Sequence, residues 1–139
     1  MEGTLNMQDM RYLNLFGRVT RIDTRFCIRY NGMLIFCVPK NLVMRAVGEN
    51  ARNIRTISEI LQKKIRIIPS PRGIQDIRTF IEDIVSPTTF KDIAVMNNEL
   101  IITAGNTQNK ANLIGRNKVR LFELQKVAKD YFGKELRIA

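Results

Sequence analysis

The spacing of apolar residues predicts the same series of elements twice along the chain. Helices are indicated by apolar positions three and four residues apart, and strands by alternating or continuous apolar runs. In the first half these patterns predict a helix, two strands, a short helix, a longer helix and a strand over residues 6–16, 25–30, 33–38, 42–47, 52–62 and 65–68. In the second half they predict that order again over residues 74–85, 92–96, 99–103, 110–114, 119–132 and 136–138.

Turn residues indicate how these elements are connected. Asn31-Gly32 and Asn97-Asn98 each separate two strand patterns and predict hairpins. Turn-forming residues at 70–73 predict a boundary between a first domain at 1–70 and a second at 71–139. In each domain a helical crossover precedes the last strand, which should therefore lie parallel to the strand before the short helix. The prediction is an α+β fold in which each domain packs a three-stranded mixed sheet against three helices.

The pattern also makes finer predictions about single residues. Gly17 is predicted to end the first helix, since glycine is common just after helix ends. Ile60 and Phe122 are predicted to face the core. Tyr12 and Tyr30 are candidates for exposed aromatic side chains. The polar residues 105–109 are predicted to form a loop.

A glycine stands between the two consecutive helices of each domain. Gly48 lies in the stretch VGENARNI and Gly115 in the stretch IGRNKVRL. Glycine tolerates a positive φ and lets another backbone approach closely, and the start of a helix can offer N–H groups to phosphate. Ordinary helix capping would also place a glycine here. Its repetition at the same junction in both halves favours a loop that binds a ligand.

The charge of the chain agrees with a polyanionic ligand. Lys and Arg number 23 against 13 Asp and Glu, which gives a net charge of +10. The first domain carries 12 basic and 5 acidic residues and the second carries 11 and 8. A pI of about 10.1 is typical of nucleic-acid binders. A basic surface also serves solubility, so charge alone does not decide the function.

Several classes of protein are disfavoured by what the sequence lacks. The chain has no His, no pairing of a nucleophile with a base and no complete phosphate-binding loop of the ATPase type, so we expect no enzyme activity, cofactor, metal or small-molecule substrate. No apolar run approaches the roughly 18 residues of a membrane span, and the start does not read as a secretion signal. We expect a soluble cytoplasmic protein. Cys27 and Cys37 should lie on opposite faces of a hairpin and remain free thiols.

The order of elements resembles that of the type II KH domain, and the tandem pair resembles the archaeal NusA-like transcription factors. The likeness covers nearly the whole chain. The stretches that carry it are MRYL and LF at 10–16, VGENARNI at 47–54, FIED through SP at 80–87, IGRN at 114–117 and KDYF at 129–132. The resemblance implies that each domain binds single-stranded RNA and that RNA polymerase is a partner in control of elongation or termination.

The same resemblance, together with the basic residues nearby, names the candidate RNA-binding residues. In the first domain these are Gly48, Asn50, Ala51, Arg52, Arg55, Lys63 and Lys64, and in the second they are Gly115, Arg116, Asn117, Lys118 and Arg120. Both loops lack the second glycine of the family pattern, because Ala51 and Lys118 stand in its place. If those positions need a positive φ, a residue other than glycine costs about 1–2 kcal/mol.

We expect RNA binding as the function and keep protein docking as the alternative. The missing second glycines favour a protein-interaction module that docks on RNA polymerase or the ribosome, whereas the net charge favours RNA binding. Glu49 would repel phosphate in the first loop, and Arg116 and Lys118 would attract it in the second. The first domain nevertheless carries the larger net charge. The sequence leaves the relative strength of the two loops undecided.

Overall fold

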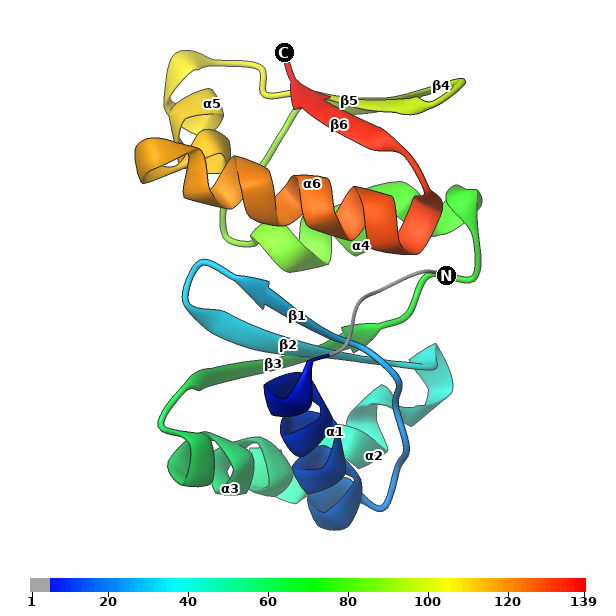
Figure 1. The fold of residues 1–139 in the computed structure, drawn as a ribbon, viewed down its shortest axis with the longest axis vertical. Coiled ribbons are helices and arrows are strands. Elements are labelled where there is room, and N and C mark those ends of the chain that lie inside the picture. The colour runs from blue at the N-terminus through cyan, green and yellow to red at the C-terminus, as the bar shows by residue number, and fades with distance from the viewer. Residues whose placement is uncertain (1–5) are drawn as a thin grey trace. The chain divides into compact units, whose positions relative to one another are not determined.

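The computed structural model describes residues 6–139, which form two compact units divided between Ser70 and Pro71 (Figure 1). Each unit is described by itself. The first contains α1 (Met7–Thr20), β1 (Cys27–Tyr30), β2 (Met33–Val38), η1 (Lys40–Leu42), α2 (Val43–Val47), η2 (Glu49–Ala51), α3 (Arg52–Leu61) and β3 (Lys64–Pro69). The second contains η3 (Ile74–Asp76), α4 (Ile77–Val85), β4 (Asp92–Met96), β5 (Glu99–Thr103), α5 (Thr107–Ile114), η4 (Arg116–Lys118), α6 (Val119–Phe132) and β6 (Glu135–Ile138).

The two sheets have the same topology. The strands are ordered β1-β2-β3 in the first and β4-β5-β6 in the second. The first pair in each sheet is antiparallel and the second pair is parallel. The α+β class, the two mixed three-stranded sheets and the predicted parallel last strands are therefore confirmed. Within each unit, Figure 1 shows the helices gathered on one face of the sheet.

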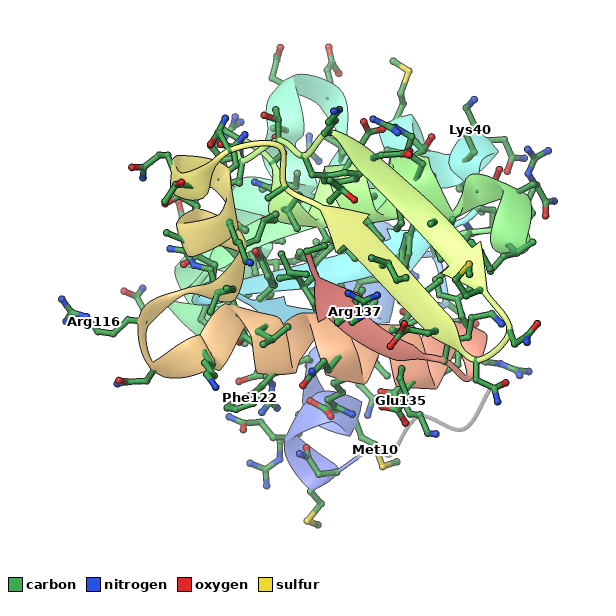
Figure 2. All side chains as sticks on the ribbon, turned by 90° about the horizontal axis from the view of Figure 1, so that it is seen from above. Met10, Lys40, Arg116, Phe122, Glu135 and Arg137 are labelled. Carbon is green, nitrogen blue, oxygen red and sulfur yellow. The ribbon has the colours of Figure 1, made fainter. Side chains whose placement is uncertain are left out.

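The second sheet has one buried face and one exposed face. Leu136 is buried on the inner face, whereas its neighbours Glu135 and Arg137 point outward and are exposed (Figure 2). On the outer face Arg137 Nε lies 3.1 Å from Glu99 Oε1. The alternation follows from the pleat, which sends successive side chains to opposite faces.

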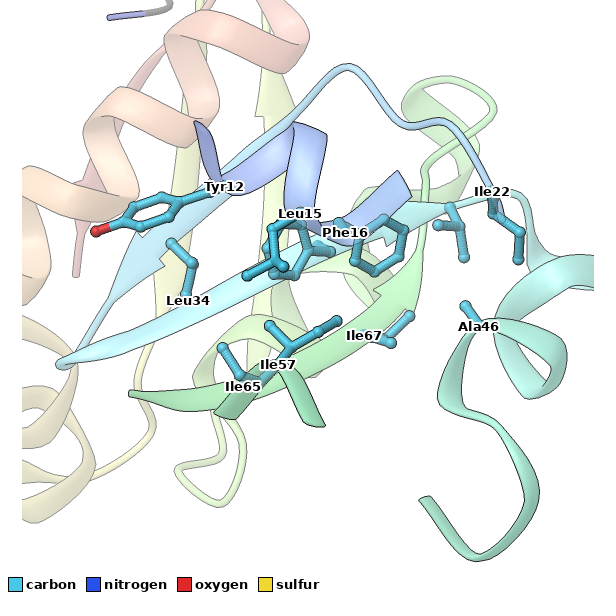
Figure 3. Packing of buried hydrophobic residues seen from close by; sticks show 11 residues of the cluster. Tyr12, Leu15, Phe16, Ile22, Leu34, Ala46, Ile57, Ile65 and Ile67 are labelled. Atoms are coloured by element: carbon cyan, nitrogen blue, oxygen red, sulfur yellow. The ribbon is translucent and has the colours of Figure 1, made fainter. Parts of the chain in front are cut away.

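Strand β2 is different, since all six of its residues are buried. A continuous apolar run is typical of a strand buried on both faces. On the face toward the helices, Leu34 and Phe36 join a core with Phe16 of α1 and Ile57 of α3 (Figure 3). The rings of Phe16 and Phe36 stack with their centroids 4.5 Å apart. In the second unit the rings of Phe80 and Tyr131 lie 4.9 Å apart, tilted by 49° to each other.

Helix α1 continues through Gly17, so the prediction that it ends there is wrong. It runs to Thr20 and ends at Arg21, whose φ of 61° is left-handed. Arg21 N donates to Gly17 O at 2.9 Å, and Thr20 Oγ1 donates to Phe16 O at 2.7 Å. Glycine in a helix costs only about 1 kcal/mol, and the last turn buries Thr20 in return.

The loop predicted at 105–109 is partly helix. Asn106 Oδ1 accepts a hydrogen bond from Asn109 N at 2.8 Å, which caps α5 and starts it at Thr107. The first turn of α5 is polar because it faces water. An apolar pattern therefore could not reveal it.

Two predictions about side-chain burial were also wrong, and two candidates for exposure are buried. Ile60 and Phe122 are each 57% exposed, although both were predicted to face the core. Tyr12 and Tyr30 are 6% and 2% exposed, although both were candidates for exposure. A tyrosine ring has a large apolar area and can be buried in the core although it carries a polar hydroxyl group.

Candidate nucleic-acid interface

The two glycine loops share one backbone conformation. The φ angles are 81° at Gly48 and 76° at Gly115, a region that side chains other than glycine rarely adopt. A Cβ added at Gly48 would lie 3.0 Å from the side chain of Asn53, and one added at Gly115 would lie 2.8 Å from that of Arg120. Glycine is required at both positions for steric as well as conformational reasons.

Two consecutive left-handed residues then turn each loop into the following helix. Asn50 and Ala51 have φ angles of 54° and 58°, and Asn117 and Lys118 have 56° and 62°. Asparagine tolerates this region better than most residues, but alanine and lysine do not. The positions without the second glycine thus hold a positive φ in both units, and the loop keeps its shape at a local energetic cost.

A side chain five residues after each glycine ties the loop to the helix before it. Asn53 Nδ2 donates to Ala46 O at 3.1 Å. In the second unit Arg120 Nη1 donates to Asn112 O at 3.0 Å. Arg120 was predicted as an RNA contact, and the structure places it half-buried against α5. Both side chains position the loop.

The backbone donors open to a ligand lie within the loop, before the helix. Lys118 N donates to Gly115 O at 3.2 Å, and Val119 N donates to Arg116 O. Among residues 6–139, the N–H groups of Arg116 and Asn117 donate none of the backbone hydrogen bonds found outside helices and strands, and the same is true of Glu49 and Asn50 in the first loop. Adjacent N–H groups of this kind can form a concave anion site.

The second loop presents two exposed cations. Arg116 and Lys118 belong to none of the ion pairs found among residues 6–139. Figure 2 shows the Arg116 side chain extending outward from the loop, away from the body of its unit. An exposed guanidinium without an acidic partner is available to a phosphate.

The first loop is less basic where it turns. Glu49 is exposed between Gly48 and Asn50, and the cations follow only in α3. Arg52 is exposed, whereas Arg55 Nη1 donates back to Asn50 O. One of the two arginines is therefore partly engaged by the loop itself, and a carboxylate lies beside the glycine.

Lys63 and Lys64 lie away from the first loop. They follow the end of α3, and the loop precedes its start, so about 15 Å of helix separates them. Both are exposed. Sequence reasoning also missed Arg45, which is exposed in the last turn of α2 and lies closer to Gly48. The sequence could have indicated Arg45, because it is a basic residue three positions before Gly48.

A hollow lies elsewhere in the first unit. A cleft of about 640 Å³ is lined by Leu13, Asn14, Gly17, Arg18, Arg21, Asp23 and Thr24, at the end of α1. The partial negative charge at a helix C-terminus opposes anion binding there, despite the two arginines. We refer to it below as the α1 cleft.

The remaining chemistry of the described residues is sparse. Among residues 6–139, no group of three or more Cys, Asp and Glu residues is arranged to hold a metal ion. Cys27 and Cys37 are free thiols. Burial, reinforced by the nearby Asp9 carboxylate, raises the pKa of Cys27 to about 12. The Cys27 thiol therefore stays protonated at neutral pH and is a poor nucleophile.

Comparison with known proteins gives a distant relative and structural likenesses. No protein-family model matches the chain. Over 100 residues it is 24% identical to the probable transcription termination protein NusA of Methanococcus vannielii, and the match covers 70% of this chain and 56% of that protein. The chain thus spans little more than half the length of that relative.

The structural likeness covers nearly the entire chain. The crystal structure of APE1850 matches 97% of this chain and 100% of that one, with a TM-score of 0.66 and 22% identity. At this identity the match shows a shared fold. No helix within residues 6–139 has the length and apolar character needed to cross a membrane.

Proposed function

We propose that this protein is a tandem type II KH protein that binds single-stranded RNA at its two glycine loops and acts in transcription elongation or termination beside RNA polymerase. The shared backbone of the loops around Gly48 and Gly115 carries the proposal. Two segments with different sequences keep one strained conformation at the same junction, which supports a common ligand. The order of elements and the similarity to a NusA protein support the family and the process.

The loop geometry favours RNA binding over protein docking alone. The alternative function, docking on a protein partner, was argued from the absence of the second glycine in both loops. Ala51 and Lys118 nevertheless hold the positive φ that this glycine would supply, so the argument from its absence weakens. The exposed cations of the second loop add a reason for a polyanionic ligand.

We assign the stronger site to the second unit. Arg116 and Lys118 lie in the loop itself, whereas the first loop carries Glu49. Net charge over a whole unit acts at long range and is screened by salt, but charge in the loop contacts the phosphate directly.

A fluorescence titration with a labelled single-stranded RNA tests this assignment. We expect micromolar binding that weakens as salt rises, because bound phosphates release counterions. Replacing Arg116 and Lys118 with Asp should weaken binding about tenfold, or about 1.4 kcal/mol. It should also lower the slope of log K against log salt by about 0.7 for each phosphate that the variant no longer neutralises.

The matched control replaces Arg52 and Arg55 with Asp, which changes the charge of the chain equally in the other unit. We expect a smaller loss of affinity from this variant. Equal affinity of the Arg116→Asp/Lys118→Asp variant and the unchanged protein would refute the assignment to the second loop.

A further inference from the structure

We propose that Phe122 is a stacking platform for one base of the RNA strand whose phosphate lies at the Gly115 loop. The inference rests on the proposed function and adds a base contact to it. It starts from the ring of Phe122, which is 57% exposed on α6. Val119, one turn earlier on the helix, is 51% exposed.

The exposure of Phe122 is unusual within its unit. Phe80 and Phe90 are 2% and 7% exposed, and Tyr131 and Phe132 are half-buried. The residues that α6 buries in the core are Leu124, Val127 and Ala128. The ring of Phe122 therefore contributes little to the core and leaves apolar surface in water.

The position of Phe122 links it to the basic loop. Lys118 caps the start of α6, and Phe122 follows four residues later. Phe122 therefore lies within about 6 Å of the start of α6, measured along the helix axis, and it shares one helix face with Val119, three residues earlier. Figure 2 shows Phe122 projecting outward from α6, near the end of the helix from which the loop carrying Arg116 departs. A strand whose phosphate contacts this loop brings its neighbouring base close to the ring.

The first unit has arginines at the positions equivalent to Val119 and Phe122. Counting from each glycine, Arg52 and Arg55 correspond to Val119 and Phe122. Arg55 donates to the carbonyl of Asn50 and so helps to close its own loop. Phenylalanine has no donor, so the ring at 122 cannot take that role. The second unit thus combines cations in the loop with an apolar surface on the helix.

This combination matches a single-stranded nucleic acid. Proteins that bind single strands pair cations for the backbone with aromatic rings for the bases, because every base has a π-face. The cations beside the ring favour a polyanionic ligand over an apolar protein surface. We therefore assign the exposed ring and Val119 to a nucleobase.

The absence of tryptophan from the chain allows a direct test. In the Phe122→Trp variant the single indole reports on stacking, since a base placed against it quenches its fluorescence. A single-stranded RNA oligonucleotide should quench this fluorescence. Inorganic polyphosphate, which carries phosphates without bases, should not.

Met96→Trp provides a matched control. Met96 is also 57% exposed but lies on the β4–β5 hairpin. That hairpin adjoins the other end of α6, since Glu135 N donates to Asn98 O at 2.8 Å. Its indole should not respond to RNA.

Affinity measurements on Phe122→Ala and Phe122→Tyr complete the test. Loss of the ring should weaken RNA binding about tenfold, and tyrosine should preserve it. If wild-type RNA binding persists while the Phe122→Trp indole is unquenched and Phe122→Ala binds equally, stacking is refuted. If the unchanged protein binds no RNA, the proposed function itself fails before any variant is compared.

Discussion

Ala51 and Lys118 are the residues whose conformation a sequence reveals least. Their φ angles of 58° and 62° lie in a region that glycine and asparagine favour. Neither residue type signals such a backbone. The expectation arose only from their places relative to Gly48 and Gly115. Position in the repeated loop, and not residue type, predicted the strain.

Relief of this strain can be measured as stability. Ala51→Gly removes the cost of about 1–2 kcal/mol for a left-handed residue. It adds about 0.4–1 kcal/mol of chain entropy to the unfolded state. We therefore expect a net stabilisation of about 0.5–1 kcal/mol in urea unfolding. Ala51 carries no charge, so the change isolates the backbone effect.

Gly48→Ala is the converse variant. It should destabilise the protein, because its new Cβ would lie 3.0 Å from Asn53 and its φ of 81° is unsuitable for alanine. A destabilising Ala51→Gly substitution would show that the loop does not hold the left-handed conformation in solution.

Side-chain burial was the other residue-level property that the sequence predicted unevenly. Periodicity placed Ile57 and Leu124 in the core correctly. It misplaced Ile60, which lies at the edge of the apolar face of α3. Phe122 was expected in the core because it is aromatic, but it lies two residues before the buried Leu124 and therefore on nearly the opposite side of α6. A helix pattern gives the direction of its face, but its width depends on what packs against it.

At the scale of elements, strands and long helices were predicted closely. The bounds of β2, β4, β5 and α6 match the predicted ranges. These segments combine apolar periodicity with a turn residue or a glycine at their ends. Helix α5 was predicted too short because its first turn is polar and depends on a cap by Asn106.

The Asn106 cap can be tested alone. Asn106→Ala removes the acceptor for Asn109 N and should destabilise the second unit by about 1 kcal/mol in thermal or urea unfolding. Asn106→Asp keeps an acceptor and should restore most of the stability. Equal stability of the alanine variant and the unchanged protein would mean that the cap contributes nothing.

At the scale of the whole molecule, one topology serves two units with different surfaces. The first unit has the larger net charge, yet its loop carries Glu49. The sequence could not decide between the loops because total charge and local charge point in opposite directions. Our proposal of the second loop rests on the side chains around each glycine.

The central claim is that RNA phosphate binds at the glycine loops, above all at Gly115. Two-dimensional ¹⁵N–¹H spectra of the protein titrated with a short single-stranded RNA test it most directly. We predict that the amides of Gly115, Arg116 and Asn117 shift first and furthest, followed by those around Gly48. Shifts confined to the α1 cleft or the outer face of the second sheet, with both loops unchanged, would contradict the account.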